Sequence, residues 1–83
     1  MPVHWEPATF DDFRCAIEEK RCEVVIHGWT RDWAREHGWN LWGFRFRRQF
    51  IKRLCASEQD FWSAYKGGAF NLHLCEHDGM WGR

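Results

Sequence analysis

Two histidines and a cysteine near the end of the chain have the spacing of a metal site. His73, Cys75 and His77 alternate along the sequence, which on a β-strand would place all three side chains on one face, about 7 Å apart along it. Zinc accepts imidazole and thiolate ligands together, and Cys22 or His27 on a neighbouring strand could supply a fourth ligand. The chain has no Cys-x-x-Cys pair or other diagnostic spacing. A small zinc-binding domain is therefore kept as an alternative, and no metal or cofactor is predicted.

Residue types that support catalysis are present but form no recognisable pattern. No local signature joins a nucleophile to its general base. The pair Gly67-Gly68 is not followed by the Lys-Ser or Lys-Thr of a phosphate-binding loop. Glu18 and Glu19 are adjacent on a predicted helix, so their carboxylates diverge instead of working as an acid–base pair. We predict that the chain is not an enzyme.

One segment, residues 39–53 (WNLWGFRFRRQFIKR), interleaves planar rings with guanidinium groups. Such side chains stack on bases and bind phosphates, so RNA or DNA binding through this segment is a second alternative. Residues 31–53 hold seven basic and two acidic residues, whereas residues 1–23 hold six acidic and three basic ones. The whole chain is neutral, with 12 residues of each sign, and exerts no strong long-range attraction on a polyanion. The same segment also fits an amphipathic helix whose charges are solvated, or paired with the acidic residues of the first helix.

The aromatic content favours a protein partner over these alternatives. The chain has seven Trp, seven Phe and one Tyr among 83 residues, and a domain of this size buries only about 60% of the surface that its unfolded chain exposes. Some rings must therefore stay exposed, and we expect Trp5 and Trp81, near the chain ends, to be the most open. Trp and Arg are the residue types most enriched at interface hot spots. The predicted partner-binding residues are Trp33, Arg35, Trp39, Trp42, Arg45, Arg47, Arg48 and Trp81.

The function expected from these observations is that of a small non-enzymatic protein-binding module. An adaptor suits the size, as does a compact inhibitor of a host complex, of the kind that phages and mobile elements encode. Nucleic acid is kept as an alternative partner, and no membrane association is predicted.

Three hydroxyl residues have the form of helix N-caps, which accept hydrogen bonds from the first free N–H groups. They predict a helix over residues 10–20 capped by Thr9, a short helix capped by Thr30 that runs through about residue 37, and a helix over residues 58–65 capped by Ser57. Gly38 and the pair Gly67-Gly68 are placed to end the second and third of these helices.

The remaining segments predict strands and one ambiguous element. The β-branched run at 23–27 and the alternating residues 69–75 predict strands, and Asp78-Gly79 predicts a turn. Residues 44–55 have helical periodicity, but alternation over 40–46 leaves a strand there as an alternative. The predicted fold is a small α+β domain over residues 1–83, with two or three antiparallel strands packed against three or four short helices.

Location and redox state follow from the same composition. No apolar run reaches the roughly 20 residues needed to cross a bilayer, and the N-terminal residues lack the pattern of a secretory signal. We therefore expect a cytoplasmic protein. Its four cysteines are expected to be free, buried thiols.

Overall fold

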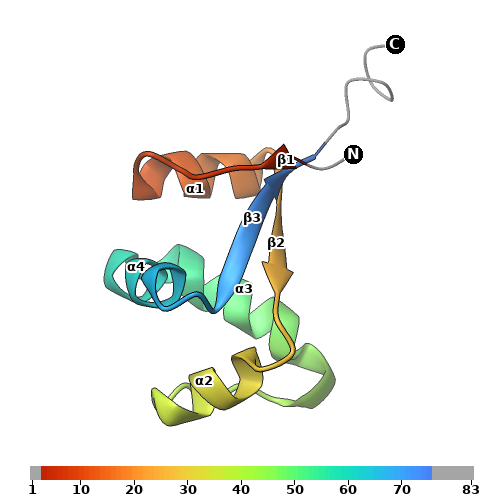
Figure 1. Ribbon diagram of the computed structural model, residues 1–83, viewed down its shortest axis with the longest axis vertical. Coiled ribbons are helices and arrows are strands. Elements are labelled where there is room, and N and C mark those ends of the chain that lie inside the picture. Colours follow the sequence, from red (N-terminus) through yellow and green to blue (C-terminus); the bar gives the residue numbers. More distant parts are fainter. Residues whose placement is uncertain (1–2, 76–83) are drawn as a thin grey trace. The chain divides into compact units, whose positions relative to one another are not determined.

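The computed structural model describes residues 3–75, and Figure 1 shows its helices and strands. In chain order the elements are β1 (Val3–His4), α1 (Phe10–Glu18), β2 (Cys22–Ile26), α2 (Thr30–Glu36), the 3-10 helix η1 (Gly43–Arg45), α3 (Phe46–Ala56), α4 (Glu58–Lys66) and β3 (Phe70–Leu74). Four α-helices and a three-stranded antiparallel sheet in this part of the chain confirm the predicted α+β class. The predicted turn at Asp78-Gly79 lies outside the described residues.

The chain forms two compact units. Unit 1 comprises Met1–Val25 and Asn71–Arg83, and unit 2 comprises Ile26–Phe70. The sequence of unit 1 has four basic and eight acidic residues, whereas that of unit 2 has eight basic and four acidic residues. The two units therefore carry formal charges of −4 and +4, and each is described separately below.

Unit 1 holds most of the sheet, in the order β1-β3-β2. The antiparallel pairing of β1 with β3 places Val3 opposite Leu74 and His4 opposite His73. Strand β1 was not predicted, because a two-residue strand is too short to show an alternating pattern.

Helix α1 begins as its cap residue predicts. The Thr9 hydroxyl accepts a hydrogen bond from the Asp12 N–H at 3.0 Å, and Phe13 and Ala16 on the helix are fully buried. The helix ends at Glu18, two residues earlier than predicted, and Lys20 then adopts a left-handed φ of 58°. A left-handed residue directs the chain out of the helix.

Aromatic rings around Phe50 make up much of the buried interior of unit 2. Phe50 is fully buried, and its ring centroid lies 5.6 Å from that of Trp39, 5.7 Å from that of Phe46 and 5.9 Å from that of Phe70. The Phe61 ring extends this network, 5.8 Å from Phe70. Stacked, tilted and edge-on ring pairs at these distances add to the stability gained from burying their area.

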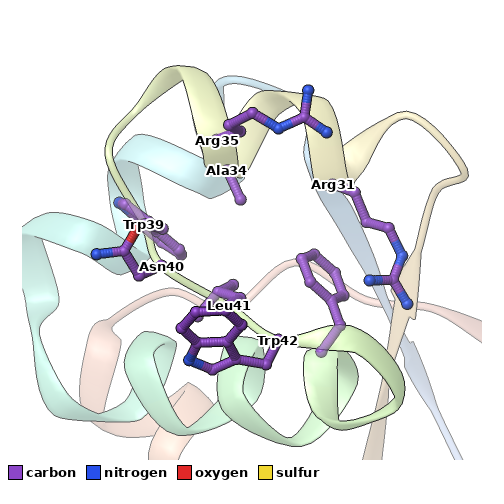
Figure 2. A pocket seen from close by; sticks show the side chains of 8 residues that line it. Arg31, Ala34, Arg35, Trp39, Asn40, Leu41 and Trp42 are labelled. Atoms are coloured by element: carbon purple, nitrogen blue, oxygen red, sulfur yellow. The ribbon is translucent and has the colours of Figure 1, made fainter.

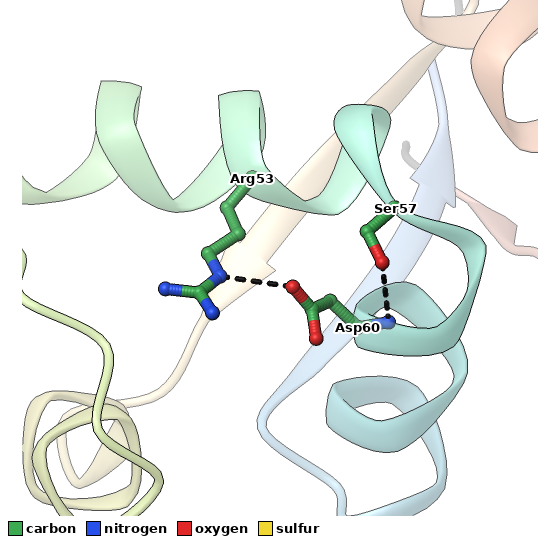
Figure 3. A network of polar contacts seen from close by, with 3 residues as sticks. All are labelled: Arg53, Ser57 and Asp60. Atoms are coloured by element: carbon green, nitrogen blue, oxygen red, sulfur yellow. Dashed lines mark hydrogen bonds and ion pairs between the residues drawn. The ribbon is translucent and has the colours of Figure 1, made fainter.

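The junction between α3 and α4 is held by polar contacts (Figure 3). The Ser57 hydroxyl caps α4 by accepting the Asp60 N–H at 3.2 Å, as predicted. Asp60 also takes part in a second hydrogen bond, in which its side-chain Oδ2 accepts from Arg53 Nε at 2.9 Å. The same guanidinium lies over the Trp39 ring, 4.4 Å from its centroid. Arg53 therefore joins α3 to α4 and to the segment that holds Trp39.

The predicted capping role of Thr30 is wrong. Helix α2 begins at Thr30 itself, and its N-cap, Trp29, makes no side-chain cap bond. The Thr30 hydroxyl is buried and donates instead to the Ala69 carbonyl at 2.5 Å. A buried hydroxyl needs a partner, and this partner is 39 residues away in sequence. The predicted left-handed glycine after the helix is confirmed, since Gly38 has a φ of 77°.

Candidate functional site

The segment that joins α2 to α3 exposes two large aromatic rings. In residues 40–45, which we call the aromatic turn, Phe44 is 94% exposed and Trp42 is 68% exposed. They are the most exposed of the large hydrophobic residues in the described part of the chain. The aromatic turn contains η1 and leads directly into α3.

The alternative strand over residues 40–46 is wrong. In a strand, Trp42, Phe44 and Phe46 would share one face. Instead, Gly43 adopts a left-handed φ of 37° and the backbone enters the 3-10 helix, so that Phe44 is exposed while Phe46 is buried. The helical alternative is confirmed, as α3 starts at Phe46.

Two side chains fix the backbone of the aromatic turn. Gln49 Oε1 accepts a hydrogen bond from the Trp42 N–H at 2.6 Å, and Arg31 Nη2 donates to the Gly43 carbonyl at 3.1 Å. The Arg31 guanidinium also lies 4.5 Å from the centroid of the buried Phe46 ring. The exposed rings are therefore carried on a backbone that is tied to α2 and α3, which lowers the conformational entropy lost on binding.

Sequence reasoning missed both anchoring residues. Arg31 lies before the basic aromatic segment, and its contact spans 12 residues. Gln49 belongs to the polar positions of an amphipathic helix, where nothing local distinguishes it. Each role depends on a backbone group whose position is set by the tertiary structure.

The predicted arginines fall into different surroundings. Arg35 pairs with Asp32 at 3.1 Å, and both side chains are exposed. The Arg45 guanidinium lies 5.8 Å from the Phe44 ring centroid, so a cation adjoins the most exposed ring of the aromatic turn.

Helix α3 carries the other two predicted arginines. Arg47 and Arg48 are both exposed on its first turn. Among residues 3–75, the ion pairs involve neither Arg48, Arg45 nor Arg31. These three guanidinium groups therefore add net positive charge around the aromatic turn.

Two of the predicted contact tryptophans belong to the interior. Trp39 is only 6% exposed, between Phe50 and the Arg53 guanidinium. Trp33 is half-buried, stacked on His37 at 3.9 Å and edge-on to Trp39 at 5.0 Å. Their rings complete the aromatic network of unit 2, so Trp39 is not available to a partner and Trp33 only in part.

The exposed tryptophans are not those nearest the chain ends. Trp5 is half-buried, and its backbone N–H donates to the Leu72 carbonyl at 2.8 Å. This bond holds the N-terminal segment beside β3, and the prediction that Trp5 is among the most open is wrong. Trp42 and Trp29 are the exposed ones among the described residues, at 68% and 48%. Trp81 lies outside that part of the chain.

Three hollows adjoin the aromatic turn. The first, of about 180 Å³, lies between α2 and the aromatic turn, as Figure 2 shows. A second is lined by Trp42 and Phe44, and a third by Phe44, Arg31 and Arg47 among others. The surface around the two exposed rings is therefore uneven and offers concave contact on several sides.

The candidate metal ligands do not come together in the described structure. In residues 3–75, no group of three or more His, Cys, Asp or Glu side chains is placed to hold a metal ion. The His73 ring lies edge-on to that of His4, at 6.1 Å, and β3 ends before Cys75. His77 lies outside the described residues.

All four cysteines are free, as predicted, but only one is buried. Cys22 is buried, Cys55 and Cys75 are half-buried, and Cys15 is exposed. Cys15 is exposed because it lies off the face of α1 that the fully buried residues occupy.

The guanidinium of Arg21 has a shifted pKa. A hydrogen bond from Arg21 Nε to Glu19 Oε1, at 2.6 Å, raises the pKa of Arg21. Because arginine is already protonated at any working pH, this surface pair supports no acid–base chemistry.

Comparisons with known proteins show no relative. No family model matches the chain, and neither a curated protein nor a solved structure matches it significantly. Among the helices in residues 3–75, none has the length and apolar character required to cross a bilayer.

Proposed function

We propose that this chain is a non-enzymatic protein-binding module that contacts its partner through the aromatic turn and the arginines around it. One observation carries the proposal: Trp42 and Phe44 are largely exposed on a backbone that Gln49 and Arg31 tie in place. Leaving two large rings in water forgoes the free energy of burying them. A protein surface that covered them would recover it, at little cost in ordering the turn.

The charge of the surrounding surface indicates the kind of partner. Arg31, Arg45 and Arg48 adjoin or flank the rings without a carboxylate partner among residues 3–75, and unit 2 carries a formal charge of +4. A partner surface with exposed carboxylates would complement this charge and speed association.

A nucleic acid is the second candidate partner, and it has one specific observation in its favour. The hollow lined by Phe44, Arg31 and Arg47 combines a ring with two guanidinium groups, as surfaces that bind single strands do. We rank it second because the whole chain is neutral and exerts no strong long-range attraction on a polyanion.

An inhibitory role against a host complex is a narrower form of the same proposal, and it rests on size and composition. A cytoplasmic location is likewise part of the proposal.

Site-specific photo-crosslinking tests the proposed function. Phe44 is replaced by p-benzoylphenylalanine, and the protein is irradiated in a lysate of the source cells. We expect one discrete protein adduct, identified by mass spectrometry, whose yield falls at least fivefold when Trp42→Ala is added. The matched control carries the same probe at Gln59, which is exposed on α4 and lines none of the three hollows.

Two outcomes would overturn the proposal. Equal adduct yields from the probe at positions 44 and 59 would mean that the exposed rings contact proteins non-specifically. Adducts with nucleic acid, released by nuclease and weakened by salt as phosphate contacts are, would favour the second candidate.

A further inference from the structure

The hollow between α2 and the aromatic turn has both apolar and polar walls. Ala34 comes from α2, Leu41 and Trp42 from the aromatic turn, and Phe46 from the start of α3. Figure 2 shows Ala34, Leu41 and Trp42 around the opening, with Arg31 beside it.

The walls of this hollow are parts of the packed interior. Ala34 is 1% exposed, Phe46 is 5% exposed and Trp39, at its far side, is 6% exposed. Trp42 is the open wall, and its backbone is held by Gln49. A hollow whose walls are packed in this way is formed before any partner arrives.

Its size and chemistry fit one apolar side chain. The volume of about 180 Å³ is that of a single large side chain and well below the usual volume of a small-molecule site. The apolar side chains that line it can cover an aliphatic group, and the two arginines that line it can pair with carboxylates. A nucleic acid carries negative charge but no aliphatic side chain, so a protein segment matches both kinds of contact better.

Two arginines set the charge at the opening. Arg31 and Arg35 both line the hollow, and Arg31 takes part in none of the ion pairs within residues 3–75. Arg35 pairs with Asp32, but both are exposed, and such a pair is easily exchanged for another. Carboxylates next to the inserted side chain would meet these guanidinium groups.

We propose that this hollow receives one aliphatic side chain, such as leucine, from an acidic segment of the partner protein. The inference rests on the proposed function and adds the chemistry of the contact: an apolar anchor flanked by Asp or Glu. A buried anchor surrounded by charged contacts at the rim is the usual arrangement of an interface hot spot.

Short blocked peptides of defined sequence test this inference without knowledge of the partner. The probes are acetylated and amidated EELEE, EEGEE and KKLKK, titrated to 20 mM into the labelled chain and followed by NMR. We expect EELEE to shift the Trp42 indole and Ala34 methyl resonances, with a dissociation constant on the order of millimolar for so small a ligand. EEGEE should bind about tenfold more weakly, since it lacks the apolar side chain. KKLKK should bind more weakly than EELEE because its charge is repelled.

A pair of exposed aromatic residues supplies the matched variants. Trp42→Ala removes a wall of the hollow and should reduce EELEE affinity at least fivefold. Trp29→Ala removes another exposed tryptophan, which does not line this hollow, and should leave the affinity unchanged within twofold. Both positions are exposed, so neither variant is expected to unfold, and their one-dimensional spectra check this.

The outcomes separate this inference from the proposed function. Equal binding of EELEE and EEGEE, or no shifts up to 20 mM, would overturn the apolar anchor. The same holds if a ten-residue oligothymidylate shifts the Trp42 and Ala34 resonances and EELEE does not. If crosslinking from position 44 still gives a discrete protein adduct, the proposed function stands and only the anchor fails.

Discussion

The two units use aromatic residues in different ways. Unit 2 contains 11 of the 15 aromatic residues and a formal charge of +4, whereas unit 1 contains four and a charge of −4. In unit 2 most of the rings form a connected interior around Phe50, and Trp29, Trp42 and Phe44 remain outside it. In unit 1 the fully buried side chains include Phe13 but also small or aliphatic ones. The surplus of rings is thus concentrated in the basic unit.

Within unit 2, residues of one type have opposite roles. Phe50 is fully buried and Phe44 is 94% exposed, although both belong to the same basic aromatic segment. Arg53 is engaged with a ring and a carboxylate, while Arg48 is exposed. The composition of the basic aromatic segment therefore identifies the region that makes contacts, and it does not decide which of its rings and arginines are buried and which are exposed. Substitutions of interior and exposed residues should therefore differ in their effect on the free energy of unfolding.

Phe50→Ala should give the largest effect. It removes the ring that contacts Trp39, Phe46 and Phe70, and we expect a loss of about 3–5 kcal/mol in the free energy of unfolding. Urea denaturation measures it. Phe44→Ala is the control and should change stability by no more than about 0.5 kcal/mol. Similar losses for the two variants would remove the distinction between interior and exposed rings.

Thr30→Val tests the buried hydroxyl of unit 2. The variant keeps the shape but leaves the Ala69 carbonyl without its donor, which should cost about 1–3 kcal/mol. Thr30→Ser retains the hydroxyl and loses a methyl group, so its stability should fall by less than that of Thr30→Val. The opposite order, measured by thermal and urea unfolding, would show that the methyl packing matters more than the hydrogen bond.

Helix capping should not distinguish the two units. Thr9 caps α1 in unit 1 and Ser57 caps α4 in unit 2, each by accepting an N–H three residues ahead. Thr9→Ala and Ser57→Ala should each cost about 1 kcal/mol in unfolding free energy. Exchange of Thr9 for Ser and of Ser57 for Thr should cost much less. If the unfolding free energy of either alanine variant hardly changes, the first turn of that helix finds another hydrogen-bond acceptor.

Arg53→Ala should have the smallest of the measurable effects. Its side chain is 40% exposed, so the ion pair with Asp60 contributes only a few tenths of a kcal/mol, and the contact with the Trp39 ring about 0.5–1 kcal/mol. We expect a total loss of about 1 kcal/mol and a change in tryptophan fluorescence. Arg48→Ala, on the same helix, should change neither the unfolding free energy nor the tryptophan fluorescence by a measurable amount. Equal effects would show that the two arginines are not in different roles.

Much of the fold was predictable because its signals are local. The two caps at Thr9 and Ser57, the left-handed Gly38 and the alternation before Leu74 each depend on neighbouring residues. The candidate site was predictable only as a segment. The basic aromatic residues indicated the region, but Trp39 proved to be interior, and Arg31 and Gln49 were missed.

The sequence by itself determined the helices and longer strands, the concentration of rings and positive charge in one stretch, and the excess of rings over what a small interior can hold. The tertiary structure alone decided which rings are covered: it buried Trp39 against Phe50 and left Phe44 exposed on the aromatic turn. The physical reason is that backbone hydrogen bonding and capping act over a few residues, whereas burial depends on what distant segments bring to the same place. A left-handed glycine and a carbonyl held by Arg31, 12 residues away, set the direction of the exposed rings.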